Sequence, residues 1–481
     1  MKRKKFALVN VPSSENAYHN FIDFAAIFPP MGLLTIAHII EQQGYNACFF
    51  DADAKFLNLD ETVAQVVAMK PDYIGCTGMT ATMDIIGRFL AGVKKALPDT
   101  ITIIGGPHVS AIPKQTLSDY PSIDIGVIGE GDHTIVELIS ALESKGSLDH
   151  IIGIVFRKNG SIVETDTRPP IKDLSNLIHP AWHLVDFNLY RSYGWNNWVS
   201  GHRNPLGVIF TGRGCRGKCN FCASHCVFGH TMRFYPVDKI KQEIDLLVTK
   251  YGIRVLYFQD DTFTANRKVV NEICDYLIEK GYNNLLEIMV SARVDMVHAP
   301  TLKKMRHAGI RWICFGVESG NQQILDKMQK NISIEQIRKA FALANEADLF
   351  VAGNFMIGHL GETWETAMDT INLACEIKQD YASFAIAIPL PGTDLYRWCI
   401  EKGIRLPAWG KFGSVNSPPI PLNDSLNVEQ LMALRTMAIN RFFKRPSYLF
   451  RVLTRFRPFA VARDFHKMYF AVRREISESR F

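Results

Sequence analysis

The sequence predicts an α/β protein with two parallel sheets, one after the other, and a mostly helical C-terminal extension. Two observations support this fold class. Short apolar segments alternate with helical segments in two separate blocks, and turn residues follow most of the apolar segments. The 481 residues are also too many for one ordinary domain. With 47% hydrophobic and 21% charged residues, the composition is that of a globular protein with a core.

Residues 1–150 form the first block. Strands are predicted at 4–11, 46–53, 71–79, 100–106 and 124–132. Helices are predicted at 32–44, 83–97 and 133–144, and a further helix is predicted to end at residue 67. This alternation is typical of a doubly wound, Rossmann-like sheet, whose ligands bind at the carboxyl ends of the strands. Those ends carry CTGMTAT, GGPH and GEG. Glycine lets a ligand approach the backbone and threonine can donate a hydrogen bond, although plain turn chemistry also explains the glycines.

Residues 151–200 are predicted to be a linker, with a β-hairpin around Asn159-Gly160 and a proline-rich stretch after it. The second block, 201–395, contains six predicted strands, at 206–215, 254–263, 286–295, 311–320, 350–362 and 381–393. This pattern predicts a partial (β/α)6 barrel of the TIM type, with its chemistry at the strand ends. Polar residues and glycines gather there, although capped helix starts explain any single one: Asp260, Asp261, Ser291, Arg293, Glu318, Ser319, Gly358 and Gly361.

Residues 396–481 are predicted to be a helical, basic extension. The net charge is +6, but Arg441–Phe481 holds eleven Arg or Lys and three Asp or Glu, so the tail alone carries +8. The basic character therefore does not indicate a nucleic-acid surface spread over the protein. The apolar run in MKRKKFALVNVPSS is too short for a signal peptide, and no window is apolar enough for a membrane span, so we expect a cytoplasmic protein.

The stretch TGRGCRGKCNFCASHC, residues 211–226, holds four of the ten cysteines. A disulfide is not expected in a reducing compartment at this low cysteine density. The C-x3-C-x2-C spacing of Cys215, Cys219 and Cys222 fits zinc if Cys226, His225 or His230 supplies a fourth ligand. It also fits an iron–sulfur cluster, in which three thiolates would leave one iron open.

These residues, with Phe221 before the last cysteine, resemble the radical S-adenosylmethionine (SAM) superfamily. YFQDDTFTAN, SARVD, FGVESG and FMIGHLGET follow in the order of that superfamily's later strand motifs. The resemblance implies that Cys215, Cys219 and Cys222 hold a [4Fe-4S] cluster and that SAM binds the fourth iron. Cys226 then has no ligand role, and Cys274, Cys314, Cys375 and Cys399 are expected to pack in the core.

The first block resembles the cobalamin-binding domain that precedes radical SAM domains in the cobalamin-dependent class. The matching stretches are PPMGLLTIAHIIEQQG, IGCTGMTAT, IIGGPHVSAIPKQTL and DIGVIGEGDHT, and the two resemblances together cover about Phe6 to Tyr396. The chain departs from the D-x-H-x-x-G motif of the methionine-synthase type, because FIDFAAIFPPMG contains no histidine. The expected cobalamin therefore has no lower histidine ligand, and loss of cobalamin is the alternative.

The resemblance also implies roles for individual residues. Phe221, Ile357, Gly358 and Gly361 would meet the adenine of SAM. Asp260 and Asp261 would bind its amino group, Glu318 with Ser319 its ribose, and Arg293 its carboxylate, where a guanidinium can pair with two oxygens. His359-Leu360 stand where related sequences often have Leu-Pro. The residues expected to cradle cobalamin are Thr77, Thr80, Gly105, Gly106, Pro107, Gly129 and Glu130.

Three activities agree with these motifs. The first is C-methylation, in which a 5′-deoxyadenosyl radical takes hydrogen from an unactivated carbon and cobalamin supplies the methyl group. The second is an oxidative cyclase or rearrangement without methyl transfer. The third is a tRNA methylthiotransferase-like reaction, disfavoured because only Cys48 and Cys76 lie in the first block. A non-enzymatic zinc module is the alternative outside catalysis. The sequence assigns no catalytic acid or base.

The expected partners are a small-molecule substrate, hydrophobic or anionic, and an electron donor such as flavodoxin or ferredoxin. No nucleic-acid partner is expected. The Arg-rich, aromatic tail has three interpretations: an amphipathic helix on a membrane, an electropositive lid, or a helical pair that packs its aromatics on the barrel and leaves its arginines in solvent. Similar tails in relatives that act on tetrapyrroles and terpenoid lipids favour a hydrophobic substrate.

Overall fold

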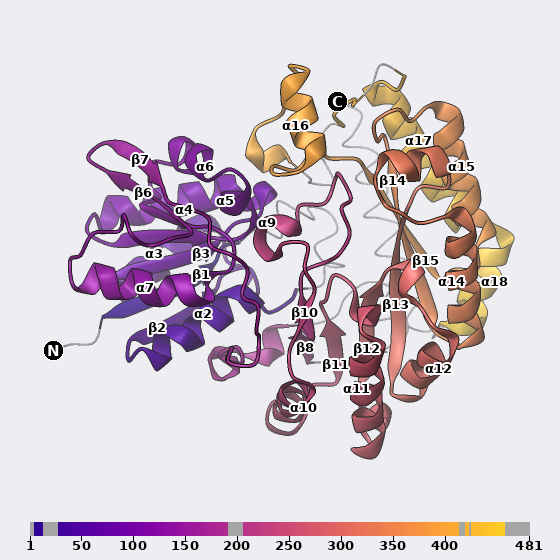
Figure 1. The fold of residues 1–481 in the computed structure, drawn as a ribbon, viewed down its shortest axis with the longest axis horizontal. Coiled ribbons are helices and arrows are strands. Elements are labelled where there is room, and N and C mark those ends of the chain that lie inside the picture. The colour runs from indigo at the N-terminus through magenta and orange to yellow at the C-terminus, as the bar shows by residue number, and fades with distance from the viewer. Residues whose placement is uncertain (1–3, 13–26, 191–204, 413–418, 423–424, 457–481) are drawn as a thin grey trace.

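The computed structural model describes residues 4–12, 27–190, 205–412, 419–422 and 425–456. It contains two large sheets, each with its own helices (Figure 1). The first belongs to an N-terminal unit and the second to a barrel unit that follows in sequence. Helices α9 and α16 lie between the two units in the view of Figure 1. The two-sheet α/β architecture that the sequence predicts is confirmed.

The first sheet has seven strands in the order β2-β1-β3-β4-β5-β6-β7. Its first five strands are parallel: β1 (Lys5–Asn10), β2 (Asn46–Asp51), β3 (Tyr73–Thr77), β4 (Ile101–Gly105) and β5 (Ile125–Val127). The hairpin β6 (Ile154–Lys158) and β7 (Ser161–Glu164) extends the sheet antiparallel. Asn159 and Gly160 turn this hairpin with positive φ, as a two-residue turn of this kind requires.

The helices of the N-terminal unit are α2 (Met31–Gln42), α3 (Leu59–Met69), α4 (Met83–Ala96), α5 (Pro107–Ala111), α6 (Pro113–Asp119) and α7 (Gly131–Glu143). Sequence reasoning did not foresee α5 and α6. Helix α3 begins at a capping box, in which the Asn58 side chain and the Glu61 side chain each bind the other's backbone N–H.

The second sheet has six parallel strands in the order β15-β14-β13-β12-β11-β8, as a partial barrel requires. Its strands are β8 (Leu206–Ile209), β11 (Val255–Phe258), β12 (Glu287–Ala292), β13 (Ile310–Glu318), β14 (Phe350–Ile357) and β15 (Tyr381–Ile386). Its helices are α10 (Val237–Asp245), α11 (Arg267–Glu279), α12 (Ala299–His307), α13 (Gln322–Lys327), α14 (Ile334–Glu346) and α15 (Trp364–Glu376). The predicted partial barrel is confirmed.

The C-terminal extension contains α16 (Asp394–Glu401), the short turn η9 (Trp409–Lys411), α17 (Val428–Phe443) and α18 (Pro446–Arg455). Phe442, Tyr448 and Phe456 are buried against the barrel. The arginines of α18 are not left in solvent, contrary to one interpretation of the sequence: Arg451 Nε lies 2.6 Å from Oδ1 of the buried Asp380. The remaining tail, residues 457–481, lies outside the described part of the chain.

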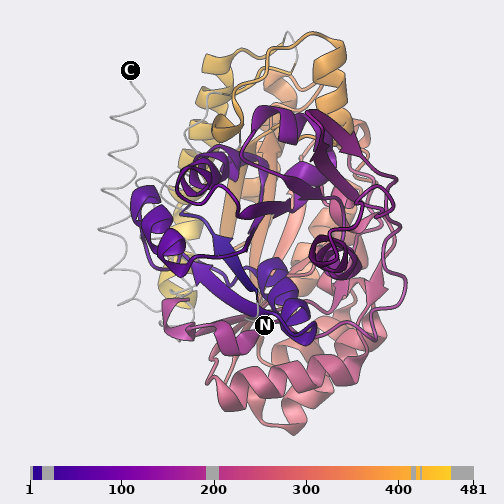
Figure 2. The ribbon, with the colours of Figure 1, turned by 90° about the vertical axis from the view of Figure 1, so that its left-hand side faces the viewer.

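Figure 2 looks onto the N-terminal unit, with the barrel unit behind it. The extension touches both units. Trp409 donates from Nε1 to Asp119 Oδ2 at 2.8 Å, and the Gly410 N–H donates to Asp84 Oδ2 at 2.9 Å. The loop at Gly129 meets α9 (His225–Phe228), since a Cβ on Gly129 would lie 3.8 Å from the carbonyl oxygen of Val227. No helix in the described part of the chain is both long enough and apolar enough to cross a membrane.

Candidate active site

The cysteines lie on one loop between two very short strands, β9 (Gly212–Arg213) and β10 (Arg233–Phe234), which pair antiparallel. We call residues 214–232 the cysteine loop. Gly217 lies between two of the thiols, because a Cβ there would be 3.4 Å from Cys215 Sγ and 3.6 Å from Cys219 Sγ. The Gly217 N–H also points to Cys215 Sγ, 3.4 Å away. The loop thus brings the first two thiols close to the same glycine.

Cys222 belongs with this pair and Cys226 does not. Burial, together with nearby Asp261, Cys219 and Cys215, raises the pKa of Cys222 to about 11. Burial also raises the pKa of Cys226, but the charge that acts on it is that of Arg397. The Cys226 thiol points away from the other three thiols and toward Gly392, since a Cβ on Gly392 would lie 2.4 Å from its sulfur. Three thiols therefore gather, and the fourth faces another part of the protein.

The donor set fits an iron–sulfur cluster. A cluster distributes its thiolate ligands over several iron atoms. Two cations lie near the thiols: burial raises the pKa of Cys219, while Lys330 and Arg293 act to lower it. Positive charge beside the loop favours thiolates, which are the form that binds iron.

Glu318 occupies a strained position at the carboxyl end of β13. Its φ is +69°, a left-handed conformation that only glycine adopts easily, and the register of β13 against β14 shifts at this point. Gly316 makes room for its side chain, because a Cβ there would lie 2.6 Å from Glu318 Oε1. Such strain persists where the surrounding structure holds a side chain in a particular place, which is frequent in active sites.

Lys330 is the partner of Glu318 and was missed by sequence reasoning. Its Nζ donates to Glu318 Oε1 at 2.8 Å, with both side chains largely buried. Burial opposes the positive charge, but the Glu318 carboxylate and Cys219 together outweigh it, and the pKa of Lys330 is raised. The ammonium also lies over the Phe221 ring, 5.9 Å from its centroid. Lys330 thus connects the strained carboxylate, the cysteine loop and the aromatic residue beside Cys222.

Two other predicted SAM contacts have partners of their own. Arg293 is buried and donates from Nε and Nη2 to Asp295, and from Nη2 to the Lys330 carbonyl at 2.9 Å. Its Nη1 faces the cysteine loop, 3.3 Å from the position of a Cβ on Gly217. Ser319 is fully buried, and its hydroxyl lies 3.2 Å from Thr370 Oγ1.

The two neighbouring aspartates at the end of β11 differ in environment. Asp260 is buried, and its Oδ1 accepts from the N–H and hydroxyl of Thr211 and from the Gly212 N–H at 2.8 to 2.9 Å. Its Oδ2 is buried and has no hydrogen-bond partner among the residues that the structure describes. Burial raises the pKa of Asp260 to about 7, although the three donors to Oδ1 oppose this. Asp261 is exposed and accepts from Ser224 Oγ at 2.6 Å.

This difference gives a pH prediction for the cofactor-free protein. Because the pKa of Asp260 is higher in the folded state, its contribution to stability is present below about pH 4 and is lost as the pH rises to about 7. Each pH unit in this window should lower the free energy of unfolding by up to about 1.4 kcal/mol. In Asp260→Asn this contribution should disappear, while the contribution of Glu362, whose pKa burial also raises to about 7, remains. Urea unfolding at several pH values measures both; identical pH profiles for the two proteins would contradict the assignment.

The loop after β14 lies next to Phe221. Gly358 and Gly361 have φ of +90° and +71°, so the turn needs glycine at both positions. The buried His359 places Nε2 2.9 Å from Asn220 Oδ1, which ties this loop to the cysteine loop. Ile357 is fully buried at the end of the strand. The residues predicted for adenine therefore lie together.

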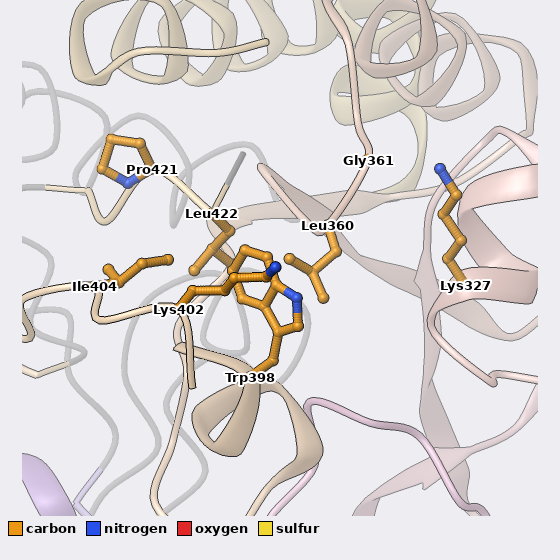
Figure 3. Close-up of a pocket in the computed structure, with 8 residues that line it drawn as sticks. All are labelled: Lys327, Leu360, Gly361, Trp398, Lys402, Ile404, Pro421 and Leu422. Atoms are coloured by element: carbon orange, nitrogen blue, oxygen red, sulfur yellow. The ribbon is translucent and has the colours of Figure 1, made fainter. Parts of the chain in front are cut away.

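A pocket of about 730 Å³ opens beside this loop. Figure 3 shows Trp398 and Lys402 on one side of it, with Leu360 and Gly361 close by and Lys327 across the opening. Ile404, Pro421 and Leu422 complete the lining. The lining of the pocket thus combines apolar side chains with two lysines, Lys327 and Lys402.

The carboxyl edge of the first sheet is open at β4. In the described part of the chain, nothing lies within 4 Å of a Cβ on Gly105, whereas a Cβ on Gly106 would lie 2.7 Å from Thr77 Oγ1. Gly106 has φ of +100°, and Pro107 follows at the start of α5. Thr80 is buried, with its hydroxyl 3.1 Å from Nδ1 of His108. Open space above a glycine at a strand end is the geometry that a large planar ligand requires.

Glu130, also predicted to cradle cobalamin, makes other contacts. Its Oε1 accepts from Arg213 Nη1 at 2.9 Å, and its Oε2 accepts from Arg233 Nη1 at 2.7 Å and from the Ile171 N–H at 2.8 Å. The preceding Gly129 has φ of +76°, and its N–H donates to Ser110 Oγ. The carboxylate of Glu130 is thus directed to the barrel unit.

Comparison with known proteins agrees with these two units. Residues 20–139 match the B12-binding domain, and residues 209–374 match the radical SAM superfamily. An uncharacterized methyltransferase of Pyrococcus horikoshii is 30% identical, over 96% of this chain and 97% of its own length. The anaerobic magnesium-protoporphyrin IX monomethyl ester cyclase of Rubrivivax gelatinosus is 27% identical, over 90% of this chain and 77% of its own.

A solved structure shares the fold. The radical SAM methyltransferase TsrM of Kitasatospora setae, solved with cobalamin and a [4Fe-4S] cluster bound, superposes with a TM-score of 0.67 and 16% identity. The match covers 82% of this chain and 75% of that chain. The sequence resemblance is therefore confirmed in both units. The chain belongs to the radical SAM superfamily, and to the class of its enzymes that carries a cobalamin-binding domain ahead of the barrel.

Proposed function

We propose that this protein is a cobalamin-dependent radical SAM C-methyltransferase acting on a small molecule. The observation that best supports the proposal is the contact between the carboxyl edge of the first sheet and the cysteine loop. The glycine-lined edge of the first sheet, at Gly129, meets α9, the short helix within the cysteine loop, at Val227. A group bound at the edge of the first sheet would therefore lie close to the loop that carries the thiols. Methyl transfer at an unactivated carbon needs both groups to reach one substrate.

In this proposal Cys215, Cys219 and Cys222 hold the cluster. Bound in this way, a reduced cluster supplies the electron that cleaves SAM, and cobalamin supplies the methyl group. Lys330 and Glu318 are placed to bind the polar end of SAM, since a buried ammonium can pair with its carboxylate and a carboxylate can accept from its amino or hydroxyl groups. Asp260 Oδ2 offers a further buried acceptor. We retain Arg293, through Nη1, with Asp261 and Ser319 as supporting residues, and Phe221, Ile357, Gly358 and Gly361 for adenine.

The residues proposed to cradle cobalamin are Thr77, Thr80, Gly105, Gly106, Pro107 and Gly129. Glu130 is instead assigned to the contact with Arg213 and Arg233, because both of its carboxylate oxygens have partners there. No histidine is proposed as an axial ligand. The stretch before α2 that would carry one lies partly in residues 13–26, outside the described residues.

Gly105→Val tests this cradle. A valine fits a strand, and its Cβ meets nothing within 4 Å, so the fold should tolerate the change. The added methyl groups would enter the space proposed for the corrin, so hydroxocobalamin should bind at least about tenfold more weakly, or ~1.4 kcal/mol. Equilibrium dialysis measures the affinity, and thermal unfolding without cofactor checks that stability is unchanged. Normal affinity in a normally folded variant would contradict the cradle.

One anaerobic experiment separates methylation from the cyclase-type alternative that the Rubrivivax relative represents. The full chain is reconstituted with iron, sulfide and hydroxocobalamin and supplied with SAM labelled in its methyl group, a reductant and a small-molecule extract of cells lacking the gene. We expect the label in a product. If 5′-deoxyadenosine forms in response to the extract but no product carries the label, the methyltransferase proposal is wrong and a rearrangement or oxidative cyclisation takes its place.

We also propose an acidic one-electron donor, such as flavodoxin or ferredoxin, as a partner. Arg216 and Lys218 are exposed on the cysteine loop, and the exposed Lys327 lies next to it, since its carbonyl accepts from Asn220 Nδ2 at 2.8 Å. Positive charge on and beside the cysteine loop favours a negatively charged donor. Cluster reduction by flavodoxin that slows steeply with salt would support this interaction, and a salt-independent rate would contradict it.

A membrane contact through the C-terminal region rests on helix α18. Leu449, Phe450 and Leu453 are 51%, 69% and 72% exposed on it, while Arg451 and Arg455 face the barrel. An apolar face of this kind suits a lipid surface or a hydrophobic substrate. Sedimentation with anionic liposomes tests it, with a chain lacking residues 446–481 as the control. Equal sedimentation of the two proteins would remove the membrane contact.

A further inference from the structure

The base of the cysteine loop is a very small piece of sheet. Strands β9 and β10 are two residues long, and they pair Arg213 with Arg233 and Gly212 with Phe234. A two-stranded pair of ordinary length is at best marginally stable by itself. Here one of the two directly opposed pairs consists of two arginines, and like charges in that position destabilise a strand pair. The base of the loop therefore needs negative charge from elsewhere.

That charge comes from the N-terminal unit. Asp132 accepts from Arg213 through both oxygens, Oδ2 from Nη1 at 2.9 Å and Oδ1 from Nη2 at 3.0 Å. Glu130 accepts from Arg213 through one oxygen and from Arg233 through the other, at 2.9 and 2.7 Å. The four side chains are between 2% and 11% exposed, so solvent screens them little. We call these four residues the interdomain charge clamp.

The clamp fixes both ends of the loop. Arg213 lies two residues before Cys215, and Arg233 lies immediately after the loop. Arg213 also donates from Nε to Tyr235 Oη at 2.9 Å, and Arg233 donates from Nη2 to the Phe228 carbonyl at 2.7 Å. Each guanidinium thus connects an N-terminal carboxylate to the backbone or side chains around the loop. Glu130 and Asp132 in turn stand at the start of α7, directly after Gly129.

We infer that Glu130, Asp132, Arg213 and Arg233 are positioning residues, through which the N-terminal unit holds the cysteine loop closed and sets its distance from the carboxyl edge of the first sheet. The first half of this inference needs only the described contacts. The second half rests on the proposed function, because it places cobalamin at that edge and the cluster on the loop. The cysteine loop belongs to the barrel unit, but in this inference the N-terminal unit holds it in place.

Hydrogen exchange on the full chain, without cofactors, tests the first half. In Arg233→Gln and in Asp132→Asn, amide exchange in residues 211–234 should become at least roughly tenfold faster, because the loop base opens more often. Asp380→Asn is the matched control, because it also removes a buried carboxylate that is paired with an arginine, Arg451. Asp380 belongs to the barrel unit and lies far from the cysteine loop in sequence. Unchanged exchange in 211–234 in the two clamp variants, or an equal increase in Asp380→Asn, would overturn the inference.

A spectroscopic measurement tests the second half. In protein loaded with cluster and cobalamin and suitably reduced, the magnetic coupling between the reduced cluster and cob(II)alamin reports their separation. The coupling should be single-valued in the wild type and in Asp380→Asn, and broadened in Arg233→Gln and Asp132→Asn. A coupling that stays sharp in the clamp variants would show that the clamp does not set this distance. A wild type that binds no cobalamin would defeat the proposed function instead, while the exchange result would still decide the clamp.

Discussion

Cys222→Ala is expected to lose the iron–sulfur cluster and all reductive cleavage of SAM. Three thiols gather around Gly217 and Asp261, and removing one leaves the cluster with two protein ligands. Iron and sulfide analysis after anaerobic reconstitution measures the cluster, and chromatography of 5′-deoxyadenosine measures cleavage. The wild type should hold about four iron atoms per chain, and the variant close to none.

Cys226→Ala is the matched control, because it removes a thiol of similar burial from the same loop. Its sulfur points to Gly392 instead of toward the other three cysteines. We therefore expect about four iron atoms per chain and normal SAM cleavage. Loss of the cluster in this variant as well would mean that four cysteines hold it, and the open coordination position proposed for SAM would not exist.

Lys330→Gln is expected to have the second large effect, on stability and on SAM together. The change leaves the Glu318 carboxylate buried without its partner, and breaking a buried pair in this way destabilises proteins by about 3–5 kcal/mol. It also removes the ammonium proposed to bind the SAM carboxylate. Chemical denaturation of the cofactor-free protein measures the first effect, and the KM for SAM in the cleavage reaction measures the second.

The double variant Glu318→Gln/Lys330→Gln distinguishes the two effects. Because it removes both charges, most of the lost stability should return. The affinity for SAM should not return, since neither charged group is restored. Recovery of SAM cleavage together with stability would show that the pair is structural and that SAM is bound by other residues.

The arrangement of the sheets was predictable because it depends on local pattern. Apolar runs bounded by Gly, Thr and Pro fall at each of the parallel strands, so strand number and order of appearance follow from the sequence. Helices α5 and α6 were not predicted. They have five and seven residues, and each begins at a proline, so neither is long enough to show helical periodicity.

The site residues that belong to a local sequence motif were predictable. Those that meet only because distant parts of the chain come together in the fold were not. The cysteine spacing and the strand-end residues Asp260 and Glu318 belong to motifs. Lys330 lies twelve residues beyond Glu318, and only the path of α13 brings its ammonium to the carboxylate. The clamp joins residues more than eighty positions apart, so no local signal indicates it. Arg293 and Asp295, in contrast, are only two positions apart in SARVD, so their pairing could have been foreseen.

The docking of Trp409 and Gly410 onto Asp119 and Asp84 has a consequence for how the protein is made. A ribosome that has completed α7 at Glu143 must still add about 270 residues before these partners emerge, which takes roughly 13 to 53 seconds at about 5–20 residues per second. During that time the N-terminal unit lacks the piece that covers α4 and the ring of His108. The N-terminal unit is therefore synthesised first, but its contact with Trp409 and Gly410 is among the latest to form.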